Sequence, residues 1–368
     1  MIGLNRKVRR LSLVFSTVLM LMAIVGTQFL VTVSAKKPIV NDLTFESTMP
    51  PITLEYTQIL GTLGGADYEL LIPDNWNGIL VVGCKGYSHE ELEIGGPEMS
   101  WLGVNPAGVF GFGRLMMINH QVAFAYSNFG TGGFCVKEGM IRTHQLTEYI
   151  MDNYEVTGEV YLVGFSMGGL VACLLGEKYP NLYDGVLDVC GSKDVIGQHE
   201  HHKAIVEMQG ETDEETAELL REYLKGPPAS LPAAYVDSIS DESLLAMQVN
   251  FAFAVEDKII ALGGTPESKP KAYQRISATY NAEIKIPVIS IIGEFDRAVP
   301  LQQHQLYYDA VSEAGCLGYY RSYIVTNGTH VDLPIFMAIF MPPTAGFMKL
   351  RNWVEQGIAP PATGPPIP

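Results

Sequence analysis

Ser166 stands in a sequence pattern that favours a nucleophile. Residues 160–163 form a short apolar run, and Gly164, Ser166 and Gly168 follow it directly. This spacing is typical of a sharp turn from a buried strand into a helix, with the serine at the bend. Such a turn holds the serine in a strained backbone conformation and exposes its hydroxyl above the edge of the sheet. The flanking glycines are small because strand and helix crowd together there.

Two further residues could activate Ser166. Asp296 follows a second apolar run, residues 286–292, and His330 follows a strand-like segment, residues 319–325. A neutral imidazole, with a pKa of about 6.5, can take the serine proton during attack and return it to the leaving group. A buried carboxylate holds that imidazole in the required tautomer and stabilises the imidazolium that forms. The pattern predicts Ser166 as nucleophile, His330 as general base and acid, and Asp296 as the orienting acid.

The order serine, acid, histidine, each placed just after a strand, resembles the α/β-hydrolases from about residue 67 to residue 356. The residues that carry this resemblance are 164–169, 293–300 and 328–330. Residues 353–357 are also similar to the end of tannase and feruloyl-esterase-like hydrolases. The resemblance implies an α/β fold of the hydrolase type, with a mostly parallel sheet flanked by helices.

The same resemblance implies an oxyanion hole with two backbone donors. One is the N–H of Met167, and the other comes from the loop after the strand expected at residues 78–82. Alignment with the His-Gly pattern of the family places the second donor at Tyr87. This chain has Lys85 and Gly86 in place of His-Gly. The departure leaves a backbone donor intact, and Lys85 is expected either to bring its charge into the site or to stay solvated.

The acid is the residue with the strongest rivals. Asp194 follows the preceding strand, where some members of the superfamily place the acid, and Glu294 lies two residues closer to the strand than Asp296. Asp296 is favoured because the chain turns there, directly beyond an apolar strand, at the carboxyl edge of the sheet. Val299, Pro300 and a helix-like segment follow it, a layout common in this superfamily.

The remaining segments alternate between strand-like and helix-like patterns. This alternation indicates a mostly parallel sheet that is covered on both faces. We expect strands at residues 52–60, 68–72, 78–83, 122–127, 160–163, 185–189, 286–292 and 319–325, and helices at residues 110–121, 139–154 and 301–314.

Residues 193–283 break the alternation. The clearest helices there are residues 213–225 and 241–262, separated by glycine- and proline-containing segments. The resemblance implies a helical lid at this place, and extra core helices are the alternative. The run His199-Glu200-His201-His202 has no metal-ligand spacing, so we expect surface histidines rather than a metal site.

The first 35 residues differ from the rest of the chain. Four basic residues between Arg6 and Arg10 precede an apolar run at residues 11–33, and residues 33–35 offer small side chains for signal cleavage. We expect a cleaved signal peptide, with an uncleaved membrane anchor as the alternative. Both place the protein outside the cytoplasmic membrane, extracellular or at the cell surface. The hydrolase core would then span residues 36–192 and 284–358, followed by a proline-rich tail at residues 359–368.

The composition disfavours one class of partner, nucleic acid, but does not determine the disulfide pairing. The formal net charge is −16, which disfavours nucleic acid because phosphate contacts need clustered Lys and Arg. The five cysteines match no zinc or redox spacing, and their spacing does not fix any disulfide pairing. The oligomeric state is equally undetermined by the sequence. Membrane contact is expected only through the N-terminal segment.

The sequence therefore predicts an exported serine hydrolase that acts on a small ester. A carboxylesterase forming an acyl-serine intermediate is the first expectation, and it requires neither a metal nor an organic cofactor. A serine peptidase of the same fold is the alternative, since Glu90, Glu91 and Glu93 could bind a free amino terminus. A non-catalytic binding module on the same scaffold is a third hypothesis, which the intact Ser166, Asp296 and His330 argue against.

Overall fold

A computed structural model describes residues 56–91, 94, 120–261, 280–330, 345–364 and 366 of the chain. The N-terminal segment, residues 110–119 of the expected helix and Glu93 lie outside the described residues. Within that part of the chain, no helix is both long and apolar enough to cross a membrane.

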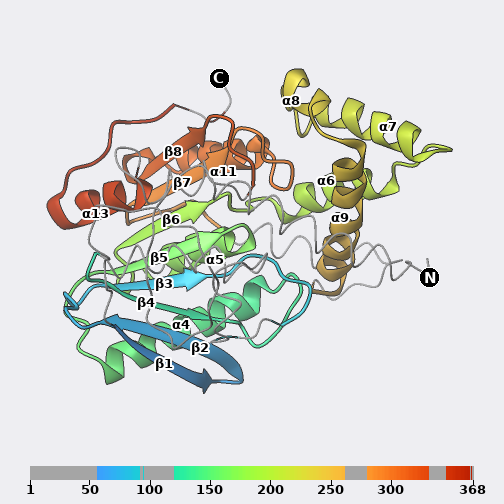
Figure 1. Ribbon diagram of the computed structural model, residues 1–368. Helices are drawn as coiled ribbons and strands as arrows, with labels where there is room; N and C mark the ends of the chain where they lie inside the picture. Colours follow the sequence, from blue (N-terminus) through green and yellow to red (C-terminus); the bar gives the residue numbers. More distant parts are fainter. Residues whose placement is uncertain are drawn as a thin grey trace, which may run out of the picture.

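Eight strands form one sheet (Figure 1). Their order across the sheet is β1-β2-β4-β3-β5-β6-β7-β8, and neighbours from β4 to β8 run parallel. β1 and β2 form an antiparallel hairpin whose second strand pairs antiparallel with β4. The strands are β1 (Tyr56–Leu63), β2 (Ala66–Pro73), β3 (Leu80–Cys84), β4 (Ala123–Ser127), β5 (Val160–Phe165), β6 (Gly185–Val189), β7 (Val288–Gly293) and β8 (Tyr320–Val325).

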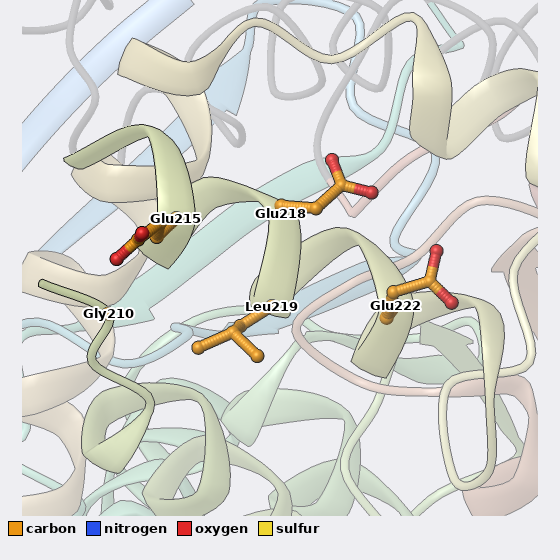
Figure 2. A pocket seen from close by; sticks show the side chains of 5 residues that line it. All are labelled: Gly210, Glu215, Glu218, Leu219 and Glu222. Carbon is orange, nitrogen blue, oxygen red and sulfur yellow. The ribbon is translucent and has the colours of Figure 1, made fainter. Parts of the chain in front are cut away.

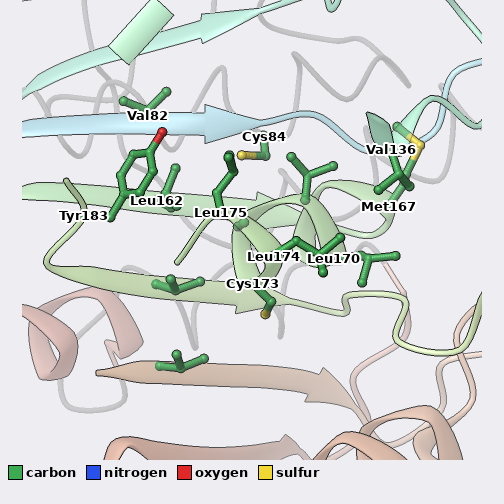
Figure 3. Close-up of a cluster of buried hydrophobic side chains, with 14 of the residues drawn as sticks. Val82, Cys84, Val136, Leu162, Met167, Leu170, Cys173, Leu174, Leu175 and Tyr183 are labelled. Carbon is green, nitrogen blue, oxygen red and sulfur yellow. The ribbon is translucent and has the colours of Figure 1, made fainter. Parts of the chain in front are cut away.

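Helices cover both faces of this sheet. Side chains of α4 (Val136–Asn153), α5 (Met167–Lys178) and α11 (Leu301–Glu313) belong to the larger apolar core cluster, and those of α13 (Gly346–Gln356) belong to the cluster on the opposite face. Figure 3 shows Leu175 of α5 beside Val82 of β3 and Leu162 of β5 in the larger cluster. The arrangement confirms the predicted mostly parallel sheet flanked by helices.

The parallel strands are buried from end to end. Every residue of β3, β4, β5, β6 and β7 is buried, so these strands are nearly continuous apolar runs rather than alternating patterns. This burial explains why the positions of these strands could be predicted from the sequence. A parallel sheet also brings the carboxyl ends of β3, β5 and β7 to one edge, where the candidate site residues follow.

In the described residues between β6 and β7, 190–261 and 280–287, the chain forms four helices: α6 (Val195–Glu207), α7 (Asp213–Lys225), α8 (Ala233–Asp237) and α9 (Asp241–Ala261). They share a small apolar cluster of their own that includes Ile205, Leu220 and Leu244. We call these helices the helical insertion, and Figure 1 shows them extending away from the sheet. A pocket in the helical insertion is lined by Gly210, Glu215, Glu218, Leu219 and Glu222, none of which is a candidate catalytic residue (Figure 2).

Helix α6 was not predicted from the sequence. Its buried face is largely polar, with Gln198, His199, His201 and His202 among the buried residues, so it has no clear apolar periodicity. A local signal was present in Asp194, whose side chain accepts a hydrogen bond from Ile196 N at 3.0 Å and caps the helix.

The C-terminal tail runs along β8, the last strand of the described sheet. Arg321 Nε donates to Pro360 O at 2.8 Å, and Ser322 N donates to the Thr363 hydroxyl at 2.9 Å. These bonds hold the tail beside β8 and occupy the backbone N–H of Ser322.

Candidate active site

Ser166 occupies the turn between β5 and α5, as the sequence predicts. Its φ of 54° and ψ of −121° lie in a region that residues with a Cβ rarely adopt. The two flanking glycines permit this turn. A Cβ on Gly168 would lie 2.0 Å from Cys84 O, and a Cβ on Gly164 would lie 2.1 Å from Gly168 O. The strand, the helix and the loop after β3 therefore meet too closely for any side chain at these two positions.

The structure brings Ser166, His330 and Asp296 together. His330 Nε2 lies 2.9 Å from Ser166 Oγ, and His330 Nδ1 lies 2.7 Å from Asp296 Oδ2. Because a carboxylate only accepts, Nδ1 carries the proton and the neutral ring leaves Nε2 free to accept from the serine hydroxyl. Asp296 is buried, whereas the His330 side chain is 21% exposed. The arrangement has the geometry of a nucleophile, a base and an orienting acid.

The other carboxylate oxygen of Asp296 is held by the backbone. Asp296 Oδ1 accepts hydrogen bonds from Ala298 N and Val299 N, each at 2.9 Å. With Oδ2 on His330, the carboxylate is fixed at both oxygens. Asp296 thus presents one oxygen to the imidazole in a constant direction.

Both rival acids have other partners. Asp194 caps α6 through Ile196 N, as described above, and Glu294 Oε2 accepts from Asn327 N at 2.9 Å. The latter contact stabilises the turn before His330, in which Gly328 N also donates to Val325 O. Glu294 therefore helps to shape the histidine loop, while Asp296 contacts the histidine itself.

The loop after β3 runs along the serine turn, where the second oxyanion donor is expected. A Cβ on Gly86 would lie 3.3 Å from Ser166 Cβ and 3.2 Å from Phe165 O. Gly86 therefore lets the backbone that leads to Tyr87 approach the nucleophile closely. Met167, the other expected donor, is the first residue of α5, so its N–H is at a helix N-terminus. Both predicted donors thus lie on backbone that borders Ser166.

Lys85 corrects one expectation of the sequence analysis. Its side chain is not solvated: it is buried, with Nζ 3.1 Å from Ser88 Oγ and 5.0 Å from the centre of the Phe129 ring. Burial lowers the pKa of the Lys85 ammonium. A flexible stem reaching an aromatic face inside the protein explains why a lysine is accommodated here.

Tyr87 also connects this loop to the helical insertion. Its hydroxyl donates to Asp257 on α9, and His89 Nδ1 lies 2.9 Å from the same carboxylate. Burial and the bond to Asp257 raise the pKa of the Tyr87 hydroxyl, which keeps it a donor. The sequence offered no signal for this contact, because it joins positions 170 residues apart.

The expectation of surface histidines in residues 199–202 was wrong for all three histidines. His199, His201 and His202 are buried, because α6 packs this face against the loop that carries Asp296. His201 Nε2 lies 2.8 Å from Arg297 O, and His202 Nε2 lies 2.8 Å from Ala298 O.

Polar groups are also buried in the sheet below the serine turn. Lys193 and Asp188 form a fully buried ion pair at 2.7 Å, and Ser290 donates to the same Asp188 oxygen at 2.6 Å. His304 on α11 is completely buried, and loss of hydration lowers its pKa to about 4.

The cysteines have no disulfide role in this structure. All five are described, and none forms a disulfide. The Cys190 thiol lies beside Asp296 and His330. Asp296 and His330 are close to each other because they share a hydrogen bond.

Comparison with known proteins agrees with this fold. Residues 141–222, from α4 into α7, match the family model described as "Putative esterase". No curated protein matches the sequence. The structure is similar to feruloyl esterase B from Aspergillus oryzae, with 14% identity, a TM-score of 0.54, and 84% of this chain and 83% of that chain covered.

A second solved structure, an esterase from Aspergillus oryzae, is similar at 15% identity and a TM-score of 0.52, with 85% of this chain and 82% of that chain covered. At these identities the likeness concerns the fold, and it extends over most of both chains. The strand order, the serine turn after β5 and the later acid and histidine loops agree with it. The protein therefore has the fold of the α/β-hydrolases.

Proposed function

We propose that this protein is a serine hydrolase, and specifically a carboxylesterase that acts outside the cytoplasmic membrane. One observation carries the proposal: Ser166 Oγ, His330 and Asp296 form a continuous hydrogen-bonded chain at a strained strand-to-helix turn. The match of residues 141–222 to an esterase family model supports a hydrolase in the same region.

The geometry suits acyl transfer in two steps. In the first, His330 Nε2 takes the Ser166 proton while Oγ attacks the ester carbonyl carbon, and the resulting imidazolium is stabilised by Asp296. The carbonyl π bond becomes an oxyanion, which the N–H groups of Met167 and Tyr87 would receive. Collapse of this intermediate expels the alcohol, protonated by His330, and leaves an acyl group on Ser166.

Water completes the reaction. His330, neutral again, takes a proton from water as its oxygen attacks the acyl carbon, and the second oxyanion occupies the same donors. Its collapse returns the proton to Ser166 Oγ and releases the carboxylic acid. Each step uses side chains, backbone donors and water, so the proposed mechanism requires no metal or organic cofactor.

The substrate is proposed to be a small ester rather than a peptide. Of the acids considered for binding a free amino terminus, Glu91 has a partner already, since it accepts from Asn128 Nδ2 at 2.9 Å. We further propose that the helical insertion acts as a lid, because α9 contacts the Tyr87 loop and α6 contacts the Asp296 loop.

The export proposal rests on the basic cluster at Arg6 to Arg10 and the apolar run at residues 11–33. N-terminal sequencing of the native protein tests it. Cleavage after Ala35 supports a released enzyme, and an intact N-terminus in the membrane fraction supports an anchor. A cytoplasmic protein that still carries Met1 contradicts both.

A serine-reactive fluorophosphonate tests the mechanism directly. We expect covalent labelling of the wild-type protein and none of Ser166→Ala, and peptide mapping should place the label on the peptide that contains Ser166. A panel of p-nitrophenyl esters and aminopeptidase substrates then separates the two activities. Undiminished labelling of Ser166→Ala would sink the assignment.

A further inference from the structure

The two backbone donors to Asp296 have a feature in common. Each N–H is one end of a peptide unit whose carbonyl end is bonded by a side chain of α6. Ala298 N shares its peptide unit with Arg297 O, which lies 2.8 Å from His201 Nε2. Val299 N shares its unit with Ala298 O, which lies 2.8 Å from His202 Nε2. Both peptide units therefore stand between a histidine and the triad acid.

Peptide planarity makes this connection stiff. The carbonyl oxygen and the N–H of one unit point in opposite directions in a single plane, so fixing the oxygen also fixes the direction of the N–H. A hydrogen bond on the oxygen also polarises the N–H and strengthens the bond that it donates. Because a carbonyl only accepts, both histidines carry a proton on Nε2.

We propose that His201 and His202 are positioning residues for the triad acid, acting through the peptide units 297–298 and 298–299 on the Asp296 carboxylate. The inference rests on the proposed serine hydrolase function and deepens it. It assigns a role to part of the helical insertion in the chemical step, in addition to any covering of the site.

Other helices of the insertion hold the two rings in place. His201 Nδ1 lies 3.2 Å from the Tyr223 hydroxyl of α7, and the two rings are stacked at an interplanar angle of 19°. The His202 ring stacks on Phe251 of α9, with ring centres 4.0 Å apart. Neighbouring helices thus fix the orientation of both side chains, as a positioning group requires.

The two histidines differ in how replaceable they are. Gln198 Nε2 also donates to Ala298 O, at 3.0 Å, so this oxygen has two α6 donors. Arg297 O has His201 as its α6 donor. We therefore expect the loss of His201 to affect the reaction more than the loss of His202.

A matched pair of amide substitutions tests the proposal. In His201→Gln the amide nitrogen can take the place of Nε2 and still reach Arg297 O, whereas in His201→Asn it can only take the place of Nδ1. We expect His201→Asn to lower kcat by about 10- to 100-fold with KM within about threefold of wild type, and His201→Gln to stay within about threefold. A merely structural role predicts equal effects of the two amides, and that result would overturn the proposal.

The corresponding changes elsewhere on α6 sharpen the test. His202→Asn should lower kcat less than His201→Asn, because Gln198 still holds Ala298 O. The double change Gln198→Leu with His202→Asn should then approach the His201→Asn value. A larger loss in His202→Asn alone would contradict the assignment of the two donors.

A readout that needs no substrate separates this inference from the proposed function. The proton between His330 Nδ1 and Asp296 should give a low-field ¹H resonance in the wild type and in His201→Gln, and a displaced or broadened one in His201→Asn. An identical resonance in all three proteins would overturn the positioning role. Failure of fluorophosphonate to label the wild type would instead overturn the hydrolase function, and the resonance would still decide the role of His201.

Discussion

The sheet core and the helical insertion contribute to the site in different ways. Ser166 is held by apolar packing: β5 and nearly all of α5 are buried, and the glycines around the turn leave no space for adjustment. The insertion has its own apolar cluster and contacts the loops around the site through hydrogen bonds, from α6 to the Asp296 loop and from α9 to Tyr87, and through Tyr235 of α8, which stacks on Phe295. Apolar packing in the sheet core fixes the nucleophile, whereas hydrogen bonds and a ring contact from the insertion hold the loops around it.

A substitution of Asp296, in the loop after β7, should have the largest effect on the reaction rate. Asp296→Asn should lower kcat by about 10²- to 10⁴-fold, because the amide cannot hold His330 in the tautomer that accepts from Ser166. Asp194→Asn should have a much smaller effect, since Asp194 caps α6. Steady-state kinetics on both purified variants decide the matter. A collapse in Asp194→Asn beside a near-normal Asp296→Asn would reverse the assignment.

The sheet core and the helical insertion should also differ in how they unfold when each is destabilised. Leu162 in β5 and Leu220 in α7 are both fully buried, and replacing either with alanine should cost about 2–5 kcal/mol locally. Leu162→Ala should destabilise the whole protein, whereas Leu220→Ala should open the insertion first. Hydrogen exchange in peptides 195–261 and 160–178 measures this. Equal opening of both sets of peptides in both variants would show that the regions unfold as one unit.

His304 in the sheet core allows a third test, because burial keeps its side chain neutral. Burial lowers the pKa of His304 to about 4, below the unfolded value of about 6.5. The unfolded chain therefore binds the proton first, so the stability that neutral His304 provides is complete above pH ~6.5 and is lost as the pH falls toward 4. The loss should be about 3 kcal/mol. Urea unfolding of wild type and His304→Leu across this range should show a shallower acid decline in the variant, and parallel curves would contradict the prediction.

The smallest expected effect concerns strain at the nucleophile. Ser166→Gly and Ser166→Ala should both be inactive, yet the glycine variant should be more stable by about 1 kcal/mol, because only glycine adopts a positive φ freely. Urea midpoints of the two variants provide the measurement. Equal midpoints would mean that packing around the turn, rather than local backbone energy, fixes its conformation.

Much of the fold could be predicted because its signals are local. The parallel strands β3 to β7 are nearly continuous apolar runs. Ser166, Asp296 and His330 follow β5, β7 and β8, so chain order alone brought them to one edge of the sheet. The burial of Lys85 and of the α6 histidines depends instead on distant contacts. His201, for example, meets Arg297 across 96 positions, and no local pattern distinguishes such a residue from a surface histidine.

The C-terminal tail has a consequence for self-association. An edge strand with open backbone groups is a template for pairing with another molecule. The bond from Ser322 N to Thr363 occupies a backbone donor of β8, and the Arg321 side chain holds Pro360 beside the strand. A chain shortened to residue 358 should therefore keep its activity when dilute but form larger particles on concentration. Dynamic light scattering would detect them, and monodisperse samples at all concentrations would show that the tail has no such protective role.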